Sequence, residues 1–201
     1  SGIQLKWDEF YSMTDSALSS AQRTLATEID GLQALSDALG DNFEQAVTKL
    51  AEISGRVIVS GMGKSGHIGS KIAATMASTG TPAQFVHPGE ASHGDLGMIT
   101  SNDAVLALSW SGETAELANL IDYAKRFSIP LIALTSGADS LLGRLADICI
   151  TLPKSTEACP NGLAPTTSTT MQLALGDALA IALLEKRKFS SADFKNFHPG
   201  G

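Results

Sequence analysis

The chain has 201 residues, of which 43% are hydrophobic and 17% charged, a composition that fits one compact globular domain with a sizeable core. The formal net charge of -7 disfavours a broad electrostatic attraction to nucleic acid or anionic lipid. Because only 5% of the residues are aromatic, the stacking surfaces of proteins that bind single-stranded nucleic acid are also disfavoured. The 2 cysteines give no disulfide framework, and no apolar run approaches the ~20 residues that span a bilayer, so we expect a cytoplasmic protein without a membrane partner.

Two helices are predicted ahead of the first strand. Apolar residues recur every three or four positions over residues 7–39, which indicates a long amphipathic helix. A second apolar face covers residues 43–53, and Gly55 ends that helix. We therefore expect residues 1–55 to form N-terminal helices that pack on a domain formed by residues 56–201.

Short apolar runs, separated by helix-sized segments, make up the rest of the chain. The runs cover residues 57–59, 83–86, 104–108, 131–134 and 148–152. Helical patterns cover residues 68–78, 115–127, 141–145 and 167–188, and a short helix through Phe197 is capped by a serine of residues 190–191. This alternation predicts an α/β three-layer sandwich in which helices flank a doubly wound, five-stranded parallel sheet of flavodoxin or Rossmann type.

Glycine-rich residues 61–66 follow the first predicted strand and open a helix. They fit the dinucleotide fingerprint, but the acidic residue expected at the end of the second strand is displaced to Glu90, which disfavours NAD. A Walker loop would need glycine where Ile58 stands. Two interpretations stay open: a tight strand-to-helix turn only, or a site where backbone N–H groups and Lys64 hold a small anion such as phosphate.

Residues 109–116 occupy the equivalent place after the third strand. The hydroxyls of Ser109, Ser111 and Thr114 can surround a phosphate while the next helix points its positive end at it, or they can simply cap that helix. Glu116, one turn into the helix, is ordinarily a solvated carboxylate, and it becomes a candidate because of the neighbouring phosphate loop.

Two further loops are rich in polar side chains. Residues 86–95 contain two histidines and two carboxylates, which we interpret as an active-site loop because no metal-binding spacing or cysteine partner accompanies them. Residues 154–170 contain prolines and a glycine that exclude a regular element, followed by hydroxyls that open the last long helix. Glu157 in this loop is a candidate base, and Cys159 is expected to be an inert buried thiol.

Taken together, these segments resemble the SIS (sugar isomerase) domain, and more closely that of the arabinose-5-phosphate isomerase family. The strings that carry the resemblance are GMGKSGHIG (61–69), ASTGTPAQFVHPGEASHGDLGMI (77–99), SWSGETAE (109–116), EACPNGLAPTTSTT (157–170), GDALAIALL (176–184) and FHPGG (197–201). The resemblance implies an aldose-ketose isomerase that interconverts D-ribulose 5-phosphate and D-arabinose 5-phosphate through an enediol, without a cofactor, for Kdo and lipopolysaccharide biosynthesis. The alternative is a non-catalytic SIS sugar-phosphate sensor.

The resemblance also implies the site residues. The catalytic set is Lys64, Glu116, Glu157 and His198, and the substrate and its phosphate are expected to contact Gly63, Ser65, His93, Ser109, Ser111, Thr114, Thr166 and Thr167. We assign the proton shuttle to Glu157, with Glu116 less favoured, and oxygen polarisation or ring opening to His198 and Lys64. No metal is required, although His93 is a candidate contact for inhibitory zinc. Family members are typically homotetramers with shared active sites, so we expect His198 to enter a neighbouring subunit's site.

Two features depart from the family pattern. Trp110 stands where asparagine is usual in an S-N-S-G turn, and its indole is expected to narrow the phosphate site or alter its affinity. The pair of CBS domains that commonly follows the HPGG string in the family is absent from this sequence.

Overall fold

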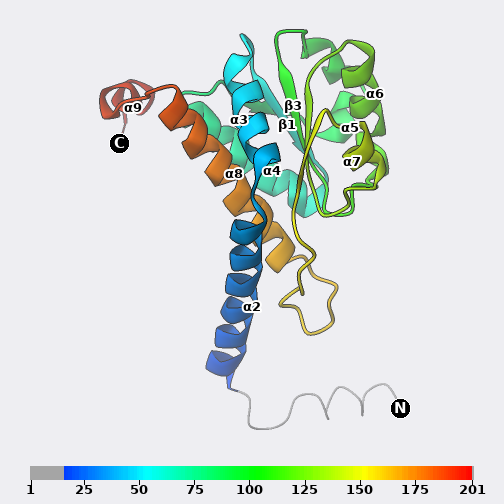
Figure 1. Cartoon of the computed structure of the whole chain (residues 1–201), viewed down its shortest axis with the longest axis vertical. Coiled ribbons are helices and arrows are strands. Elements are labelled where there is room, and N and C mark those ends of the chain that lie inside the picture. The colour runs from blue at the N-terminus through cyan, green and yellow to red at the C-terminus, as the bar shows by residue number, and fades with distance from the viewer. Residues whose placement is uncertain (1–15, 201) are drawn as a thin grey trace.

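A computed structural model of the chain describes residues 16–200 (Figure 1). Its strands are β1 (Val57–Gly61), β2 (Ala83–Phe85), β3 (Ala104–Leu108), β4 (Leu131–Thr135) and β5 (Ile148–Thr151). They form one parallel sheet in the order β2-β1-β3-β4-β5. The chain therefore winds outward from β1 to one edge and from β3 to the other, which confirms the predicted doubly wound α/β fold.

The helices agree with the predicted pattern except at some of their ends. They are α2 (Ala17–Ala38), α3 (Asp41–Glu52), α4 (Gly63–Ser78), α5 (Pro88–Ala91), α6 (Ala118–Arg126), α7 (Leu141–Leu145), α8 (Thr167–Lys186) and α9 (Ser191–Phe197), with 3-10 turns η1 (Asp95–Met98) and η2 (Ala115–Leu117). The long N-terminal helix does not continue through Ser16, because Ser16 has an extended backbone and its hydroxyl accepts a hydrogen bond from the N–H of Ser19, as an N-cap does. The earlier part of that predicted helix lies outside the described residues.

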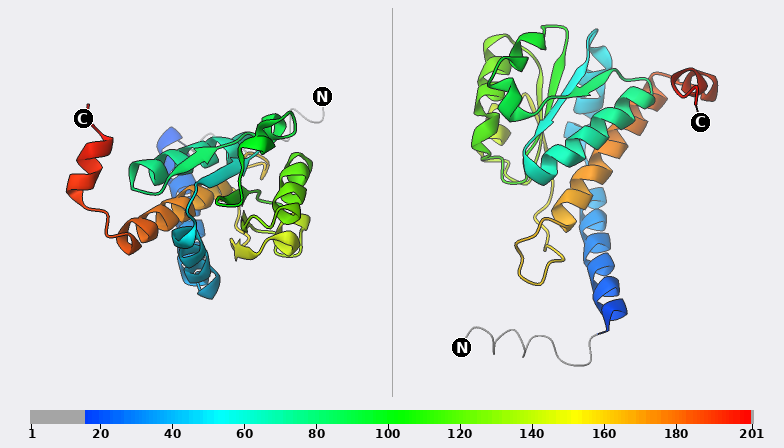
Figure 2. Two further views of the ribbon diagram at one scale, coloured as in Figure 1. Left: turned by 90° about the horizontal axis from the view of Figure 1, so that it is seen from above. Right: turned by 180° about the vertical axis from the view of Figure 1, so that it is seen from behind.

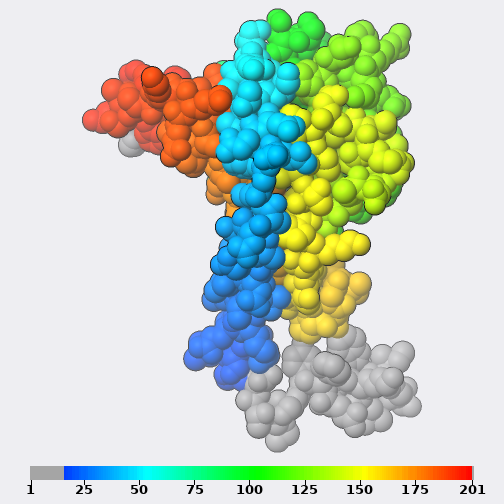
Figure 3. Space-filling model, in the orientation of Figure 1, coloured from blue at the N-terminus to red at the C-terminus, as the bar shows by residue number. Residues whose placement is uncertain are grey.

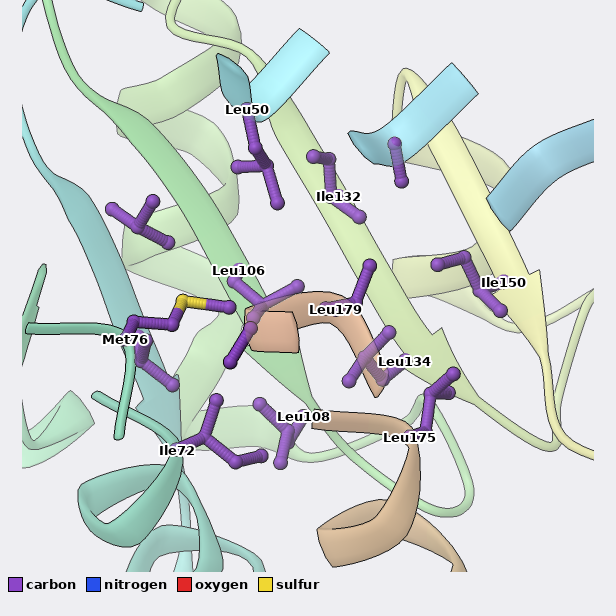
Figure 4. Close-up of a cluster of buried hydrophobic side chains, with 14 of the residues drawn as sticks. Leu50, Ile72, Met76, Leu106, Leu108, Ile132, Leu134, Ile150, Leu175 and Leu179 are labelled. Atoms are coloured by element: carbon purple, nitrogen blue, oxygen red, sulfur yellow. The ribbon is translucent and has the colours of Figure 1, made fainter. Parts of the chain in front are cut away.

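Each strand contributes side chains to two separate apolar layers. One layer joins the sheet to α3, α4 and α8, and Figure 4 shows Leu50, Met76 and Leu179 of these helices over the strands. The other joins the opposite face to α5, η2 and α6 through residues such as Ile58 and Leu120. Burial of each large side chain contributes roughly 1.5–3 kcal/mol, so these layers fix where the strand ends lie.

α8 is the central helix of one layer, where it contacts α2, α3 and α4. An 18-residue window of this 20-residue helix has a mean hydropathy of 1.2, so by length and composition it could cross a membrane, contrary to our expectation that no segment would. Half of that window is buried in the fold. Since the buried side chains, among them Leu175 and Leu179, pack on the sheet, core packing accounts for the apolar character of α8.

Two helices extend beyond the sheet. α2 forms a column that runs past the sheet's edge, and Figures 1 and 2 show it from opposite sides. The space-filling view in Figure 3 shows the column with yellow and orange residues beside it, and α2 contacts α8. Its Leu18, Leu25 and Ile29 are nevertheless 66%, 59% and 62% exposed. α9 lies at the far end of α8, where Phe189 and Phe197 contact each other with ring centroids 5.4 Å apart.

Candidate active site at the carboxyl ends of the strands

The order of the strands changes direction between β1 and β3. These strands are neighbours, yet the helix after β1 (α4) packs on one face of the sheet and the helix after β3 (α6) packs on the other. The loops that follow the two strands therefore separate at the carboxyl edge, which is where ligands bind in open α/β sheets. Residues 61–66 and 109–114, both singled out from the sequence, lie at this point.

The first loop passes directly from β1 into α4. The helix begins at Gly63, with φ +58°, so Lys64 and Ser65 lie in its first turn, earlier than the sequence pattern indicated. A side chain at Gly66 would meet the carbonyl oxygen of Gly61, which explains the glycine there as a requirement of the tight turn. The turn also presents the free N–H groups of a 16-residue helix beside the exposed Lys64, so the tight-turn and anion-binding interpretations are compatible.

The second loop is organised by its own hydroxyl groups. Ser109 Oγ accepts a hydrogen bond from the N–H of Gly112 at 2.9 Å and shares one of 2.7 Å with Thr114 Oγ1. Ser111 Oγ accepts from the N–H of Glu113 at 3.2 Å and is exposed. The Thr114 side chain makes no capping hydrogen bond to η2, so it does not act as the simple helix cap that was the alternative interpretation.

Replacing Gly112 is expected to lower the free energy of unfolding. Its φ is +72°, and a Cβ there would overlap the Ser140 side chain and lie 2.9 Å from Thr135 Oγ1. Gly112→Ala should cost about 2–4 kcal/mol through backbone strain and overlap, which lowers Tm by roughly 5–12 °C for a chain of this size. Gly162→Ala is the matched control, since Gly162 has φ +66° with nothing within 4 Å of a Cβ. Equal Tm losses in a thermal melt of the two variants would contradict this account.

Glu157 is held by the start of α8. Its Oε2 accepts hydrogen bonds from the N–H of Thr166 at 2.7 Å, from Thr166 Oγ1 at 2.9 Å and from the N–H of Ser168 at 3.2 Å. Burial raises the pKa of Glu157, but hydrogen bonds from Ser168 and Thr166 outweigh it and hold the pKa below its usual range. The structure thus presents an ionised carboxylate in a fixed position at the positive end of a helix.

Residues 86–95, the loop that contains His87 and His93, lie against the helical segments that follow residues 109–114. Asn119 at the start of α6 donates a hydrogen bond from Nδ2 to Ser92 Oγ at 3.0 Å, and α5 contacts η2. His93 follows Ser92 and is exposed, and Glu116 in η2 is exposed as well. Within residues 16–200, no group of three or more His, Cys, Asp and Glu side chains is placed to hold a metal ion.

Thr166 and Thr167 differ in their surroundings although they are neighbours. The Thr166 hydroxyl also accepts from the N–H of Ala158 at 2.9 Å, which closes the loop around Glu157. Thr167 is fully buried beneath α2, where a side chain at Gly31 would overlap it, and its hydroxyl has no hydrogen-bond partner among the described residues.

His198 lies at the opposite end of the fold from the other candidates. Its ring stacks on Phe194 with centroids 3.8 Å apart, and Nδ1 lies 2.9 Å from the carbonyl oxygen of Phe194. The 20-residue α8 separates it from Glu157, a span of about 30 Å at 1.5 Å per residue. The structure therefore does not bring His198 together with Glu157 and Lys64 of the same chain.

Large surface hollows also lie away from the strand ends. One of about 470 Å³ is lined by Arg56, Gln84 and Phe197 among others, and one of about 500 Å³ by Arg187 and Asp193 among others. Both lie beside α9, so the shape of a single chain alone does not mark the candidate site at the ends of β1 and β3. Its sequence motifs and hydrogen bonds identify it instead.

One side chain differs from its sequence-based interpretation, and two were missed. Trp110 packs partly buried against the core layer that contains α8, and its expected effect on the phosphate site stays a prediction. Cys159 is half-buried rather than buried as expected, and N–H groups led by that of Ala164 lower its pKa. Sequence reasoning did not select Ser168, which binds Glu157, or Gln172, which accepts a hydrogen bond from Ser65. A buried amide in an apolar helix was the signal available for Gln172.

Comparison with known proteins agrees with this arrangement. Residues 49–182 match the SIS domain. The chain belongs to the SIS domain family. The arabinose 5-phosphate isomerase KdsD of Pseudomonas aeruginosa is 56% identical to it over 182 residues, which cover 90% of this chain and 56% of that protein. KdsD of Yersinia pestis is also 56% identical over 182 residues, covering 90% and 55%. This chain thus spans about half the length of the curated relatives it matches.

A solved structure supports the same family and fold for this chain. An Escherichia coli CFT073 protein in complex with arabinose 5-phosphate is 41% identical, superposes with a TM-score of 0.86, and is matched over 89% of this chain and 95% of that one. Its sheet and helices correspond to those described above, so the resemblance noted in the sequence is confirmed for the family and the fold.

Proposed function

We propose that this SIS domain catalyses the interconversion of D-ribulose 5-phosphate and D-arabinose 5-phosphate. The observation that carries the proposal is that residues 61–66, residues 109–114 and the ionised Glu157 all follow strands at the same carboxyl edge of the sheet. The identity of over 50% to proteins named arabinose 5-phosphate isomerase supports this choice of substrates. Residues 56–201 form the isomerase domain in this proposal, and residues 1–55 supply helices that pack on it.

The phosphate group lies between the two loops. N–H groups at the start of α4, including that of Gly63, donate to its oxygens with the Ser65 hydroxyl, and the exposed Lys64 balances its charge. Ser109, Ser111 and Thr114 line the opposite side, with Thr166 at the start of α8. Thr167, which was expected to contact the substrate as well, is fully buried beneath α2 and has no such contact in this proposal. Ser109 and Thr114 already share a hydrogen bond, so only small rotations of their hydroxyls are needed to bind an anion.

The reaction transfers a proton between two neighbouring carbon atoms. Glu157 removes the proton from C2 of the open-chain aldose while O1 gains a proton, which gives an enediol. The same carboxylic acid then returns the proton to C1 while the hydroxyl proton leaves O2, which gives the ketose with a net transfer of one proton from C2 to C1 and one from O2 to O1. C1 is reduced as C2 is oxidised, so electrons balance without an external oxidant or reductant. Lys64 and His198 stabilise charge on the oxygens and assist ring opening, His93 contacts the sugar, and Glu116 is the less favoured alternative base.

The hydrogen bonds to Glu157 predict how kcat/KM falls at acidic pH. A carboxylate with a lowered pKa stays ionised as pH falls and loses its function as a base only when pH falls through that lowered pKa. Thr166→Val removes the 2.9 Å hydroxyl bond and should raise the pKa of Glu157, so the loss of kcat/KM should begin at higher pH than in the wild type. Thr169→Val is the control, because that hydroxyl donates to the carbonyl oxygen of Thr166. A pH profile of Thr166→Val that overlays the wild type would contradict the assignment.

Proton NMR in deuterated buffer tests the proposed reaction directly. D-arabinose 5-phosphate should convert to D-ribulose 5-phosphate, with deuterium entering at C2 of the remaining aldose. Binding of the sugar phosphate without turnover or exchange would favour the alternative, a non-catalytic sugar-phosphate sensor.

The assembly and cellular role are part of the same proposal. We place the enzyme in the cytoplasm as a homotetramer that supplies Kdo for lipopolysaccharide. The exposed apolar residues of α2, Leu18, Leu25 and Ile29, support association between copies, since such a stripe is costly to leave in water. The distance between His198 and Glu157 supports active sites shared between subunits.

A further inference from the structure

α8 contains a buried amide whose hydrogen bonding is incomplete. Gln172 is fully buried, and its neighbours along the buried side of the helix are apolar, Met171 and Leu175 among them. Its Oε1 accepts a hydrogen bond of 3.1 Å from Ser65 Oγ, and its Nε2 has no partner among residues 16–200. An unpaired buried N–H destabilises a fold, so an apolar side chain would suit this position better unless the amide has a role.

The partner of Gln172 indicates what that role is. Ser65 lies in the first turn of α4, where the proposed phosphate binds, and its hydroxyl has a single proton. In the structure that proton is directed at Gln172. A hydroxyl that binds a phosphate dianion must turn its proton to the phosphate, and it then offers only lone pairs to the amide. Oε1 cannot use them, whereas the unpaired Nε2 can.

We propose that Gln172 is a positioning residue that orients the Ser65 hydroxyl toward the phosphate by exchanging its amide oxygen for its amide nitrogen. In the structure Oε1 accepts a hydrogen bond from Ser65. In the complex the amide is turned by about 180°, Nε2 donates to Ser65 Oγ, and the hydroxyl proton is directed at a phosphate oxygen. The inference rests on the proposed function, in which Ser65 contacts the phosphate.

The same helix holds the proposed base. Glu157 is fixed by N–H groups of Thr166 and Ser168 at the start of α8, and Gln172 lies one turn further along. A hydrogen bond from Gln172 to Ser65 therefore joins the helix that positions the base to the helix that binds the phosphate. Because the phosphate end and the reacting carbons belong to one substrate, this link helps to fix their relative position.

Steady-state kinetics with D-arabinose 5-phosphate tests the role. Gln172→Met keeps the side chain's length and removes both polar atoms, so KM should rise about 5–10-fold, the equivalent of one hydrogen bond, with kcat within about twofold. Gln172→Glu should raise KM further, because an ionised carboxylate retains the hydroxyl proton and repels the phosphate. Acidification should partly reverse this extra loss, since a protonated carboxyl can donate to Ser65 as the amide does.

A double-mutant cycle separates orientation of Ser65 from general packing. In a Ser65→Ala background, Gln172→Met should change KM by less than about twofold, because the hydroxyl that it orients is gone. An equal rise in KM in both backgrounds, or a fall in kcat alone, would overturn the inference. If Gln172→Met does not fold, as judged by its thermal melt, Gln172→Asn replaces it in the same cycle with the same criteria.

The wild-type control distinguishes the two levels of the proposal. Turnover by the wild type with unchanged kinetics in Gln172→Met overturns the role of Gln172 and leaves the isomerase intact. Absence of both binding and turnover in the wild type overturns the isomerase, and with it the role of Gln172.

Discussion

Replacing Glu157 with glutamine is expected to lower kcat about 10²–10⁴-fold, the range that removal of a general base produces. The amide oxygen can still accept the hydrogen bonds from Thr166 and Ser168 that now reach Oε2, so the loop and α8 should keep their positions. The phosphate loops are untouched, and KM should therefore change little. NMR in deuterated buffer should show that deuterium no longer enters C2 of the aldose.

Substitutions at two further glutamates show whether Glu157 itself is the base. Glu116→Gln tests the less favoured base directly, and Glu113→Gln is the matched control, because the Glu113 carboxylate accepts a hydrogen bond from the N–H of Leu141 and has no proposed role in the reaction. We expect Glu113→Gln to stay within about threefold of wild-type kcat. If Glu116→Gln abolishes C2 exchange while Glu157→Gln retains it, the proton shuttle belongs to Glu116, and the hydrogen bonds around Glu157 serve the loop only.

The fold could be predicted because its signals are local. Five apolar runs in the sequence became the five strands, and the segment between each run and the next is long enough for a parallel crossover. Helix ends were less predictable. The first turn of α4 contains Gly63 and Lys64, whose residue types carry no apolar periodicity, so the pattern located that helix only from Ile68 onward.

The site was predicted in part, for a physical reason. Residues in one loop, such as Ser109 and Thr114, are near in sequence and were grouped correctly. The contact of Ser65 with Gln172 joins residues 107 positions apart, and no local pattern specifies it. The hydrogen bonds of Ser168 to Glu157 likewise depend on how the loop returns to α8. Such contacts follow from the packing of α4 against α8, which only the three-dimensional fold determines.

The length of α8 has a direct consequence for catalysis. Because about 30 Å of helix lies between Glu157 and His198, one chain cannot place both side chains on one sugar phosphate without displacing α9. A catalytic role for His198 therefore requires a second copy of the chain. This turns the expectation of shared active sites into a test of subunit complementation.

Two inactive variants should restore activity when they are mixed. Glu157→Gln subunits retain His198, and His198→Asn subunits retain Glu157, so a mixed oligomer contains sites with both intact groups. With random assembly from equal amounts, half of the sites have an intact base and half of those receive an intact histidine, so about a quarter of wild-type activity should return. Co-expression of two differently tagged chains, followed by purification through both tags, provides the mixed oligomer.

The control for complementation uses one chain with both substitutions. Glu157→Gln subunits mixed with Glu157→Gln/His198→Asn subunits contain no intact base, so their mixed oligomer should stay inactive. A shared site would be contradicted if His198→Asn alone is inactive and the first mixture is no more active than the two variants measured separately and added together. That result would instead require α9 to move toward Glu157 of its own chain, which means breaking the stacking of His198 on Phe194 and the contact between Phe189 and Phe197.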